Sequence, residues 1–139
     1  MSGAALSSVK VGDQLSPLDR TVTQAQIGAY AEASGDHNPI HVNEEFARSV
    51  GLPGTIAHGL LGMGVLAEAV SVWAGGVDRL AALSCRFSKP LFPGDTLTCS
   101  GRVVEVDEQA GTAVLELEAT SDRGDRVLTN GRASVRLHR

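Results

Sequence analysis

The sequence predicts an α+β fold in which one apolar helix lies against an antiparallel sheet. Three observations lead to this prediction. The chain has 139 residues, enough for a single domain with a core of its own. The run from His58 to Trp73 is apolar at almost every position and has the length of a helix. From Leu80 onward, apolar and polar residues alternate with the period of β-strands, joined by turns of hairpin length.

The composition excludes several classes of protein. Hydrophobic residues make up 42% of the chain and charged residues 20%, as in a soluble globular protein. The formal net charge of −4 argues against general nucleic-acid binding, which favours a basic face. No run of about 18 apolar residues is present to span a membrane, and no signal peptide is expected. Cys85 and Cys99 lack the spacing of metal ligands or of a CxxC motif, so we expect a reducing, cytoplasmic setting.

The chain is expected to begin with a loose tail, residues 1–8, because these residues are small and polar. The remaining residues, 9–139, are expected to form one domain without repeats or a linker. A first short strand is predicted over 11–18.

A first helix is predicted to begin after Thr23. The segment Thr23-Gln-Ala-Gln26 has the pattern of a capping box, in which two side chains satisfy free N–H groups at a helix start. Ile27 and Tyr30 follow at helical spacing. Tyr30 is expected to pack in the core, with a place in the wall of a pocket as the alternative. Gly35 can end this helix as its C-cap.

An acid and a histidine follow, five residues apart, in the segment Gly35–His41, which reads GDHNPIH. Pro39 fixes its own φ and keeps Asn38 extended, so Asp36 and His41 are expected on a rigid loop. A carboxylate and a neutral imidazole on such a loop suit the transfer of a proton and the activation of water. A structural role is the alternative, because an Asp before Asn-Pro often accepts hydrogen bonds in an Asx turn.

A second, short helix is predicted after Asn43, a residue type that caps helix starts. Glu44 and Glu45 would occupy its first turn, where the helix dipole favours negative charge. Phe46 and Val50 would form its buried side.

The apolar helix over 58–73 has no polar face, so it is expected to be buried on most sides. Gly59 lies at its start, where backbone N–H groups lack partners within the helix and can stabilise an oxygen that gains negative charge. His58 is expected to be structural, because its spacing pairs it with no second group. The strands that follow should direct inward alternating residues, namely Leu83, Cys85, Phe87, Leu97, Cys99, Gly101, Val103, Ala113, Leu115, Leu117, Ala119, Val127, Thr129, Gly131, Ala133, Val135 and Leu137.

The segment Gly35–His41, followed by Ala57-His58-Gly59, resembles the signature of the MaoC-like, or (R)-specific enoyl-CoA hydratase, family. The similarity covers nearly the whole chain, and within the family the chain resembles the B-type subunit of the mycobacterial 3-hydroxyacyl-carrier-protein dehydratase. The resemblance implies a hot-dog fold, a long central helix wrapped by an antiparallel sheet.

The resemblance also implies a reaction and a site. It implies reversible, (R)-specific addition of water to trans-2-enoyl thioesters of coenzyme A or acyl carrier protein. Asp36 and His41 match the catalytic pair, and the N–H of Gly59 matches the group that holds the thioester carbonyl. Asn38, Pro39 and His58 complete the motif. No metal or other cofactor is implied. Some relatives place a serine on the central helix near the acid, whereas this chain has Ala67.

Two other functions fit parts of the pattern. A hot-dog thioesterase uses an acidic residue on the central helix, and Glu68 is the one candidate. It follows His58 by ten residues where the thioesterase pattern resembles nine, and one residue turns a helix by about 100°. We therefore expect Glu68 to pair with a neighbour or to face solvent. A non-catalytic partner subunit is the second alternative, although such subunits usually lose the Asp/His pair.

The expected assembly is a homodimer that pairs two sheets edge to edge, because a single hot-dog unit leaves a long sheet edge unpaired. A heterodimer with a related hot-dog subunit is the alternative. If the carrier is an acidic acyl carrier protein, a basic rim would favour docking, and its candidates are Arg79, Arg86 and Lys89.

Overall fold

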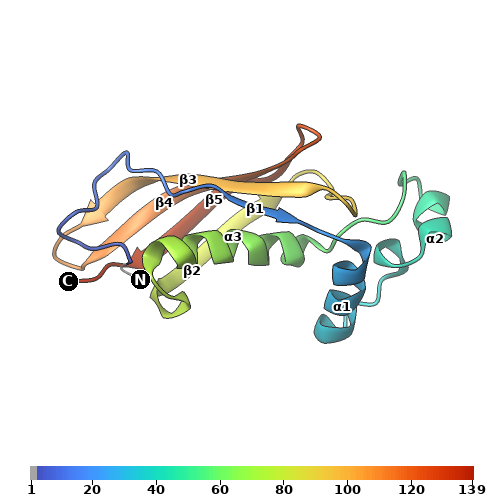
Figure 1. The fold of residues 1–139 in the computed structure, drawn as a ribbon, viewed down its shortest axis with the longest axis horizontal. Coiled ribbons are helices and arrows are strands. Elements are labelled where there is room, and N and C mark those ends of the chain that lie inside the picture. Colours follow the sequence, from blue (N-terminus) through green and yellow to red (C-terminus); the bar gives the residue numbers. More distant parts are fainter. Residues whose placement is uncertain (1–2) are drawn as a thin grey trace.

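A five-stranded antiparallel sheet and one long helix form the body of the protein (Figure 1). The computed structural model describes residues 3–139. In chain order the elements are β1 (Leu18–Thr21), α1 (Gln24–Ser34), the 3-10 helix η1 (Pro39–His41), α2 (Glu44–Ser49), α3 (Gly59–Ala74), the 3-10 helix η2 (Val77–Arg79), β2 (Leu80–Phe87), β3 (Thr96–Asp107), β4 (Thr112–Ser121) and β5 (Arg126–Arg136). The strand order is β1-β3-β4-β5-β2. The predicted α+β class is confirmed.

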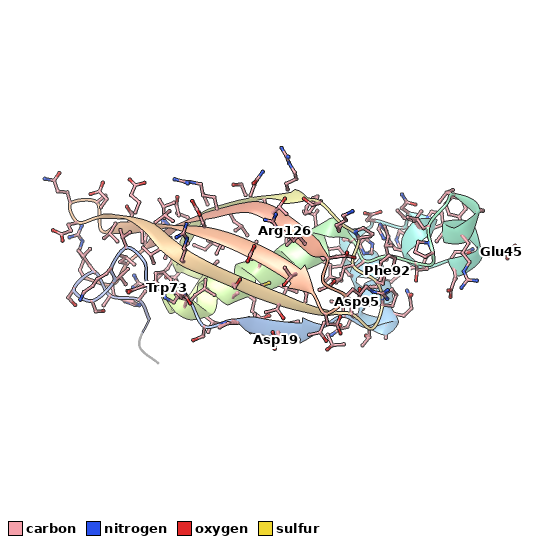
Figure 2. All side chains as sticks on the ribbon, turned by 90° about the horizontal axis from the view of Figure 1, so that it is seen from above. Asp19, Glu45, Trp73, Phe92, Asp95 and Arg126 are labelled. Carbon is pink, nitrogen blue, oxygen red and sulfur yellow. The ribbon has the colours of Figure 1, made fainter. Side chains whose placement is uncertain are left out.

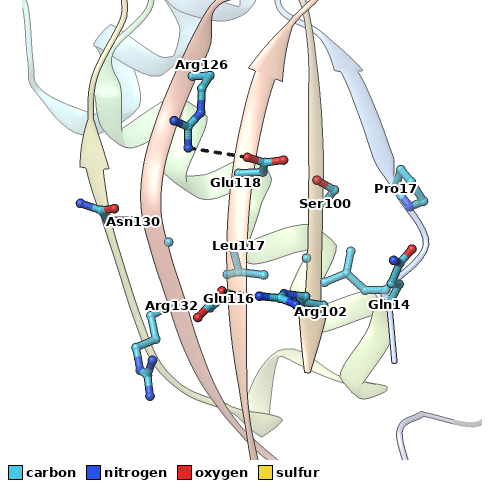
Figure 3. Close-up of a pocket in the computed structure, with 13 residues that line it drawn as sticks. Gln14, Pro17, Ser100, Arg102, Glu116, Leu117, Glu118, Arg126, Asn130 and Arg132 are labelled. Atoms are coloured by element: carbon cyan, nitrogen blue, oxygen red, sulfur yellow. Dashed lines mark hydrogen bonds and ion pairs between the residues drawn. The ribbon is translucent and has the colours of Figure 1, made fainter. Parts of the chain in front are cut away.

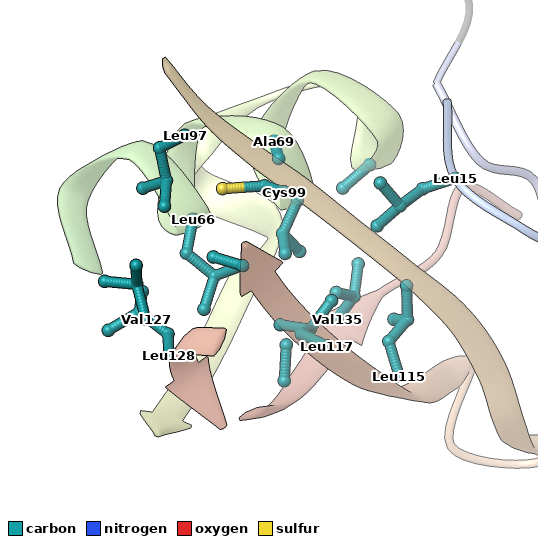
Figure 4. Close-up of a cluster of buried hydrophobic side chains, with 14 of the residues drawn as sticks. Leu15, Leu66, Ala69, Leu97, Cys99, Leu115, Leu117, Val127, Leu128 and Val135 are labelled. Atoms are coloured by element: carbon teal, nitrogen blue, oxygen red, sulfur yellow. The ribbon is translucent and has the colours of Figure 1, made fainter. Parts of the chain in front are cut away.

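The core lies between α3 and the face of the sheet that the helix covers (Figure 4). Leu66 and Val70 of α3 are fully buried there. They meet inward side chains of the long strands, among them Leu97, Cys99, Leu115, Leu128 and Val135. Each such aliphatic side chain contributes about 1.5–3 kcal/mol when it leaves water. Cys99 points into this core as predicted, and Cys85 is half-buried against it.

The strands β3, β4 and β5 pair in succession as antiparallel hairpins, joined by short loops as the sequence predicts. β2 pairs with β5 and is an edge strand. The prediction that Phe87 points inward is wrong, because the Phe87 side chain at the end of β2 is 54% exposed. A register shift between Ser84 and Arg86 breaks the alternation of this strand, as β-bulges do.

α1, η1 and α2 extend past one end of the sheet, so Glu45 of α2 lies far from Trp73 of α3 (Figures 1 and 2). The predicted buried side of α2 is wrong, because Phe46 is 39% exposed and Val50 is 55% exposed. α2 has only six residues and stands away from the core, so Ala47 alone among them is buried.

One side of α3 is uncovered within a single chain. Leu60 is 60% exposed and Val72 is 52% exposed, so the expectation that this helix is buried on most sides is wrong for the chain by itself. One sheet covers only one side of a helix. Within residues 3–139, no helix is both long and apolar enough to cross a membrane.

The start of the chain differs from both predictions made for it. Of the predicted loose tail, residues 1 and 2 lie outside the described residues. Residues 3–8 are held rather than loose: Ala4 donates to the Trp73 carbonyl at 3.1 Å, and Leu6 donates to the His138 carbonyl at 2.7 Å. The first strand begins at Leu18 and not at residue 11. Gly12 has a φ of 96°, outside the strand region, and Pro17 has no N–H to donate, so residues 11–17 cannot form a continuous strand.

Candidate active site

The loop that carries Asp36 and His41 is built by short-range hydrogen bonds. The predicted capping box starts α1 at Thr23, and Gly35 ends the helix in the left-handed conformation with a φ of 77°. The Asn38 side chain then accepts from the Ile40 N–H at 3.2 Å and caps η1, whose first residue is Pro39. This rigid turn places His41 beneath the loop, where it is buried.

The two oxygens of the Asp36 carboxylate have different surroundings. Oδ1 accepts a hydrogen bond from the Asn38 N–H at 3.2 Å, which is an Asx turn. Oδ2 lies 3.9 Å from Nε2 of His41. The Asp36 side chain is 54% exposed. One oxygen therefore holds the loop while the other faces the imidazole.

The tautomer of His41 follows from its hydrogen bond to the backbone. Nδ1 lies 2.8 Å from the carbonyl oxygen of Ile56. A carbonyl only accepts, so Nδ1 carries the proton in the neutral ring and Nε2 has a free lone pair. The gap of 3.9 Å between Nε2 and Asp36 Oδ2 is too long for a direct hydrogen bond and suits one bridging water.

His58 is the second histidine of the site. Its ring stacks on His41, with centroids 3.7 Å apart and planes inclined by 25°. Its Nε2 lies 3.1 Å from the backbone carbonyl of Asp36, and its Nδ1 is buried without a partner within residues 3–139. Tyr30, which is half-buried, packs beside it at 4.8 Å between ring centroids. The prediction that His58 has no second group is wrong, because α3 brings it against both Asp36 and His41.

Asp36, His41 and His58 each offer a ligand atom within 4.8 Å of the others, so a metal site must be considered. The lone pairs of the two stacked rings lie in nearly parallel planes. An ion at the usual Zn–N distance of about 2.0–2.1 Å would lie out of the plane of at least one ring. The geometry suits a hydrogen-bonded water better than an ion.

An apolar cavity of about 390 Å³ opens beside the two histidines, whereas Asp36 is not part of its lining. His41, His58 and Gly59 line one part of it, and Phe87 is part of its wall. The remaining lining is Leu52, Ile56, Ala57, Gly62, Ser88, Lys89, Pro90, Leu91, Val127 and Leu128. Gly59 begins α3, so its N–H lies at the positive end of the helix dipole. A polar group that enters the cavity at this end meets the imidazoles and the helix start together.

A second hollow, of about 670 Å³, lies elsewhere, on the outer face of the sheet (Figure 3). Ion pairs cross it, with Arg102 and Glu116 3.3 Å apart and Arg126 and Glu118 3.8 Å apart. None of the predicted site residues lines it. Its position and charged lining exclude it as the place where Asp36 and His41 act.

Glu68 lies outside the site. Its carboxylate is 2.6 Å from Arg20 of β1, and it does not line the apolar cavity. The prediction that Glu68 pairs with a neighbour is confirmed.

Two residues that the sequence did not signal also contact the site. Gln24 of α1 donates to the His41 carbonyl at 2.9 Å, and its side-chain oxygen accepts from the Thr55 hydroxyl at 2.6 Å. These bonds join residues 17 and 31 positions apart, so no local pattern could reveal them.

A family model for the MaoC like domain matches residues 8–123. The chain belongs to the MaoC-like family. It is 38% identical over 100 residues to 3-hydroxyacyl-thioester dehydratase Y of Mycobacterium tuberculosis. The aligned region covers 66% of this chain and 34% of that protein. The chain thus spans about one third of the length of this relative.

Solved structures show the same hot-dog fold, as predicted. A MaoC-like dehydratase superposes with a TM-score of 0.93 at 31% identity, covering 98% of this chain and 43% of that one. An (R)-hydratase from A. caviae involved in PHA biosynthesis gives a TM-score of 0.85 at 27% identity, covering 94% of this chain and 98% of that one.

Proposed function

We propose that this MaoC-like domain catalyses the reversible addition of water to trans-2-enoyl thioesters, giving (R)-3-hydroxyacyl thioesters. One observation carries the proposal: His41 lines a cavity together with Gly59, the first residue of α3, and its Nε2 stands 3.9 Å from Asp36 Oδ2. The similarity to a 3-hydroxyacyl-thioester dehydratase and to an (R)-hydratase supports the reaction class and its stereochemistry.

The proposed reaction begins with a water held between Asp36 and His41. Its oxygen bonds to C3 of the enoyl group as a proton of that water passes to the pair, and the C2=C3 electrons shift to give an enolate on the thioester oxygen. The N–H of Gly59 stabilises this oxygen. The pair then returns the proton to C2, so the elements of one water are added and no group on the protein is consumed. Dehydration is the same path in reverse.

The experiment is hydration of crotonyl-CoA, followed by the loss of enoyl absorbance. Asp36→Asn and His41→Ala should each lower kcat by about 10²-fold or more, the scale of losing a positioned acid or base. Circular dichroism and thermal melting check that both variants are folded. A folded variant of either kind that keeps wild-type kcat would overturn the roles assigned to the pair. Comparing coenzyme A with acyl-carrier-protein thioesters of increasing length identifies the carrier and the acyl class.

The thioesterase alternative has less support, because the Glu68 carboxylate is paired with Arg20 at 2.6 Å. A non-catalytic partner subunit is also less well supported, because this chain keeps both Asp36 and His41 in one site. Neither alternative explains the imidazole held in a single tautomer beside a helix start.

We also propose that the domain acts as a homodimer, with a heterodimer as the alternative. β2 leaves one edge of the sheet unpaired in the single chain, and Leu60 and Val72 leave an apolar side of α3 exposed. Both features support a second hot-dog unit packed beside the first. Light scattering tests this: a fully active monomer would refute the dimer, whereas an inactive dimer would indicate a missing partner subunit.

A further inference from the structure

Gln24 uses both ends of its side-chain amide beside the active site. Its Nε2 donates to the backbone carbonyl of His41 at 2.9 Å. Its Oε1 accepts from the hydroxyl of Thr55 at 2.6 Å. Thr55 and His41 are 6% and 7% exposed, so the amide of an otherwise exposed glutamine reaches two buried groups.

The segment that contains Thr55 also holds the imidazole of His41. The carbonyl of Ile56 accepts from Nδ1 of His41 at 2.8 Å, and the N–H of Ile56 donates to the carbonyl of Ile40 at 3.2 Å. Together with Gln24 these bonds form a closed ring. One path from Gln24 leads to the His41 backbone, and the other leads through Thr55 and Ile56 to the His41 ring.

We propose that Gln24 and Thr55 are positioning residues that fix the place and the tautomer of the His41 imidazole. This inference rests on the proposed function, because it concerns a residue of the proposed catalytic pair. A ring of hydrogen bonds permits little independent movement of its members. The bond from His41 Nδ1 to the Ile56 carbonyl is what leaves the lone pair on Nε2, and therefore toward Asp36. If the segment 55–56 moves, the His41 imidazole loses its orientation. It also loses the carbonyl acceptor that keeps the proton on Nδ1.

The size of the effect follows from the distances. The gap between His41 Nε2 and Asp36 Oδ2 is 3.9 Å, and a bridging water needs both contacts at hydrogen-bond length. A displacement of about 1 Å in a catalytic group can cost about 10²-fold in rate. Loss of one of the two hydrogen bonds of the Gln24 amide should move the His41 imidazole by less than about 1 Å. We therefore expect kcat to fall about tenfold.

Four variants separate the contributions of Gln24 and Thr55. Gln24→Glu keeps an oxygen to accept from Thr55 but has no N–H for the His41 carbonyl, and it should lower kcat about tenfold with KM nearly unchanged. Thr55→Val removes the hydroxyl in a side chain of nearly the same shape, and it should lower kcat several-fold. Thr55→Ser keeps the hydroxyl and should restore wild-type kcat. Because both residues belong to one closed ring of hydrogen bonds, the kcat of the combined Gln24→Glu/Thr55→Val variant should be little lower than that of Gln24→Glu alone.

A control lies on the same helix. Gln26 closes the capping box, with its side chain accepting from the Thr23 N–H at 3.0 Å, and among the described residues no hydrogen bond joins it to His41. Gln26→Ala should lower the melting temperature through loss of the cap while kcat stays at the wild-type level. If Gln24→Glu only loosened α1, it would behave like Gln26→Ala.

The decisive readout does not depend on activity. Long-range ¹H–¹⁵N NMR spectra distinguish the two neutral tautomers of a histidine, and wild-type His41 should show the proton on Nδ1. Gln24→Glu and Thr55→Val should give a mixture of tautomers, whereas Gln26→Ala and Thr55→Ser should not. Wild-type tautomer populations in both Gln24→Glu and Thr55→Val would overturn the positioning role. If the wild-type protein hydrates no enoyl thioester yet the tautomer shifts as expected, the proposed function fails and the positioning role stands.

Discussion

Substituting Gly59 with alanine tests where the thioester carbonyl binds. Gly59 has no left-handed φ that would exclude a side chain, so alanine fits the backbone. A Cβ added there would lie 3.1 Å from two atoms of the Phe87 ring and 3.2 Å from a third. Carbon atoms prefer separations of about 3.5–4.0 Å, so the ring must move by several tenths of an ångström.

The cost of this movement is set by the freedom of Phe87. Overpacking in a closed core costs about 1–3 kcal/mol. Phe87 is 54% exposed on an edge strand, so it can turn away and the cost to folding should be at or below the lower limit, about 1 kcal/mol. Activity should suffer more, because Phe87 and Gly59 both line the cavity. We expect kcat/KM for crotonyl-CoA to fall about tenfold, which corresponds to about 1.4 kcal/mol of transition-state stabilisation.

A double-mutant cycle with Phe87→Ala identifies the cause. In that background the added methyl group has room, so Gly59→Ala should change kcat/KM by less than about twofold. Steady-state hydration of crotonyl-CoA by all four proteins, with melting curves as the folding check, gives the coupling. Full activity of Gly59→Ala in the wild-type background would show that substrate does not bind against this helix start. An equal loss in both backgrounds would show that the ring is not the cause.

The other predictions concern stability and reactivity. Glu68→Gln should change the free energy of unfolding by less than about 1 kcal/mol, because the pair with Arg20 is partly exposed, and should leave hydration within several-fold. Release of free thiol from acyl-CoA that depends on Glu68 would contradict this. Burial, with the nearby carboxylates of Glu68 and Asp19, raises the pKa of Cys99 from 9.0 to about 12. The stability that this thiol contributes is fully present below pH 9 and is lost as pH rises toward 12, so urea unfolding should show the advantage of wild type over Cys99→Ala shrinking across that range. Leu66→Ala should cost about 2–5 kcal/mol by leaving a cavity in the core, as chemical denaturation measures.

The features that the sequence predicted well depend on residues close together in the chain. The cap at Thr23, the end of α1 at Gly35 and the cap at Asn43 each need bonds across only a few positions, and all three are present. The approach of Asp36 to His41 is of the same kind, because one turn of the chain around Pro39 brings them together. Such bonds form wherever the local residues permit them, so their pattern can be read without knowing the rest of the fold.

The features that the sequence missed depend on how distant segments pack. His58 meets Asp36 across 22 positions because α3 begins against the loop. Phe46 and Val50 have the spacing of a buried helix side, yet α2 projects from the sheet and leaves both exposed. Hydrophobic spacing predicts which side of an element can be buried, but it carries no information on whether another element arrives to cover it.

The two interpretations of Asp36, a turn former and a catalytic acid, do not exclude each other. Oδ1 accepts a hydrogen bond from the Asn38 N–H at 3.2 Å, and this bond fixes the loop. The same bond orients Oδ2 toward His41. The structural bond thus provides the preorganisation that a catalytic carboxylate needs. It also explains why Asp36→Asn is a sharper test than Asp36→Ala: asparagine keeps an oxygen for the turn and removes the charge, whereas alanine removes both. A loss of activity in Asp36→Asn with an unchanged melting temperature therefore reports on the chemistry of Oδ2 rather than on the shape of the loop.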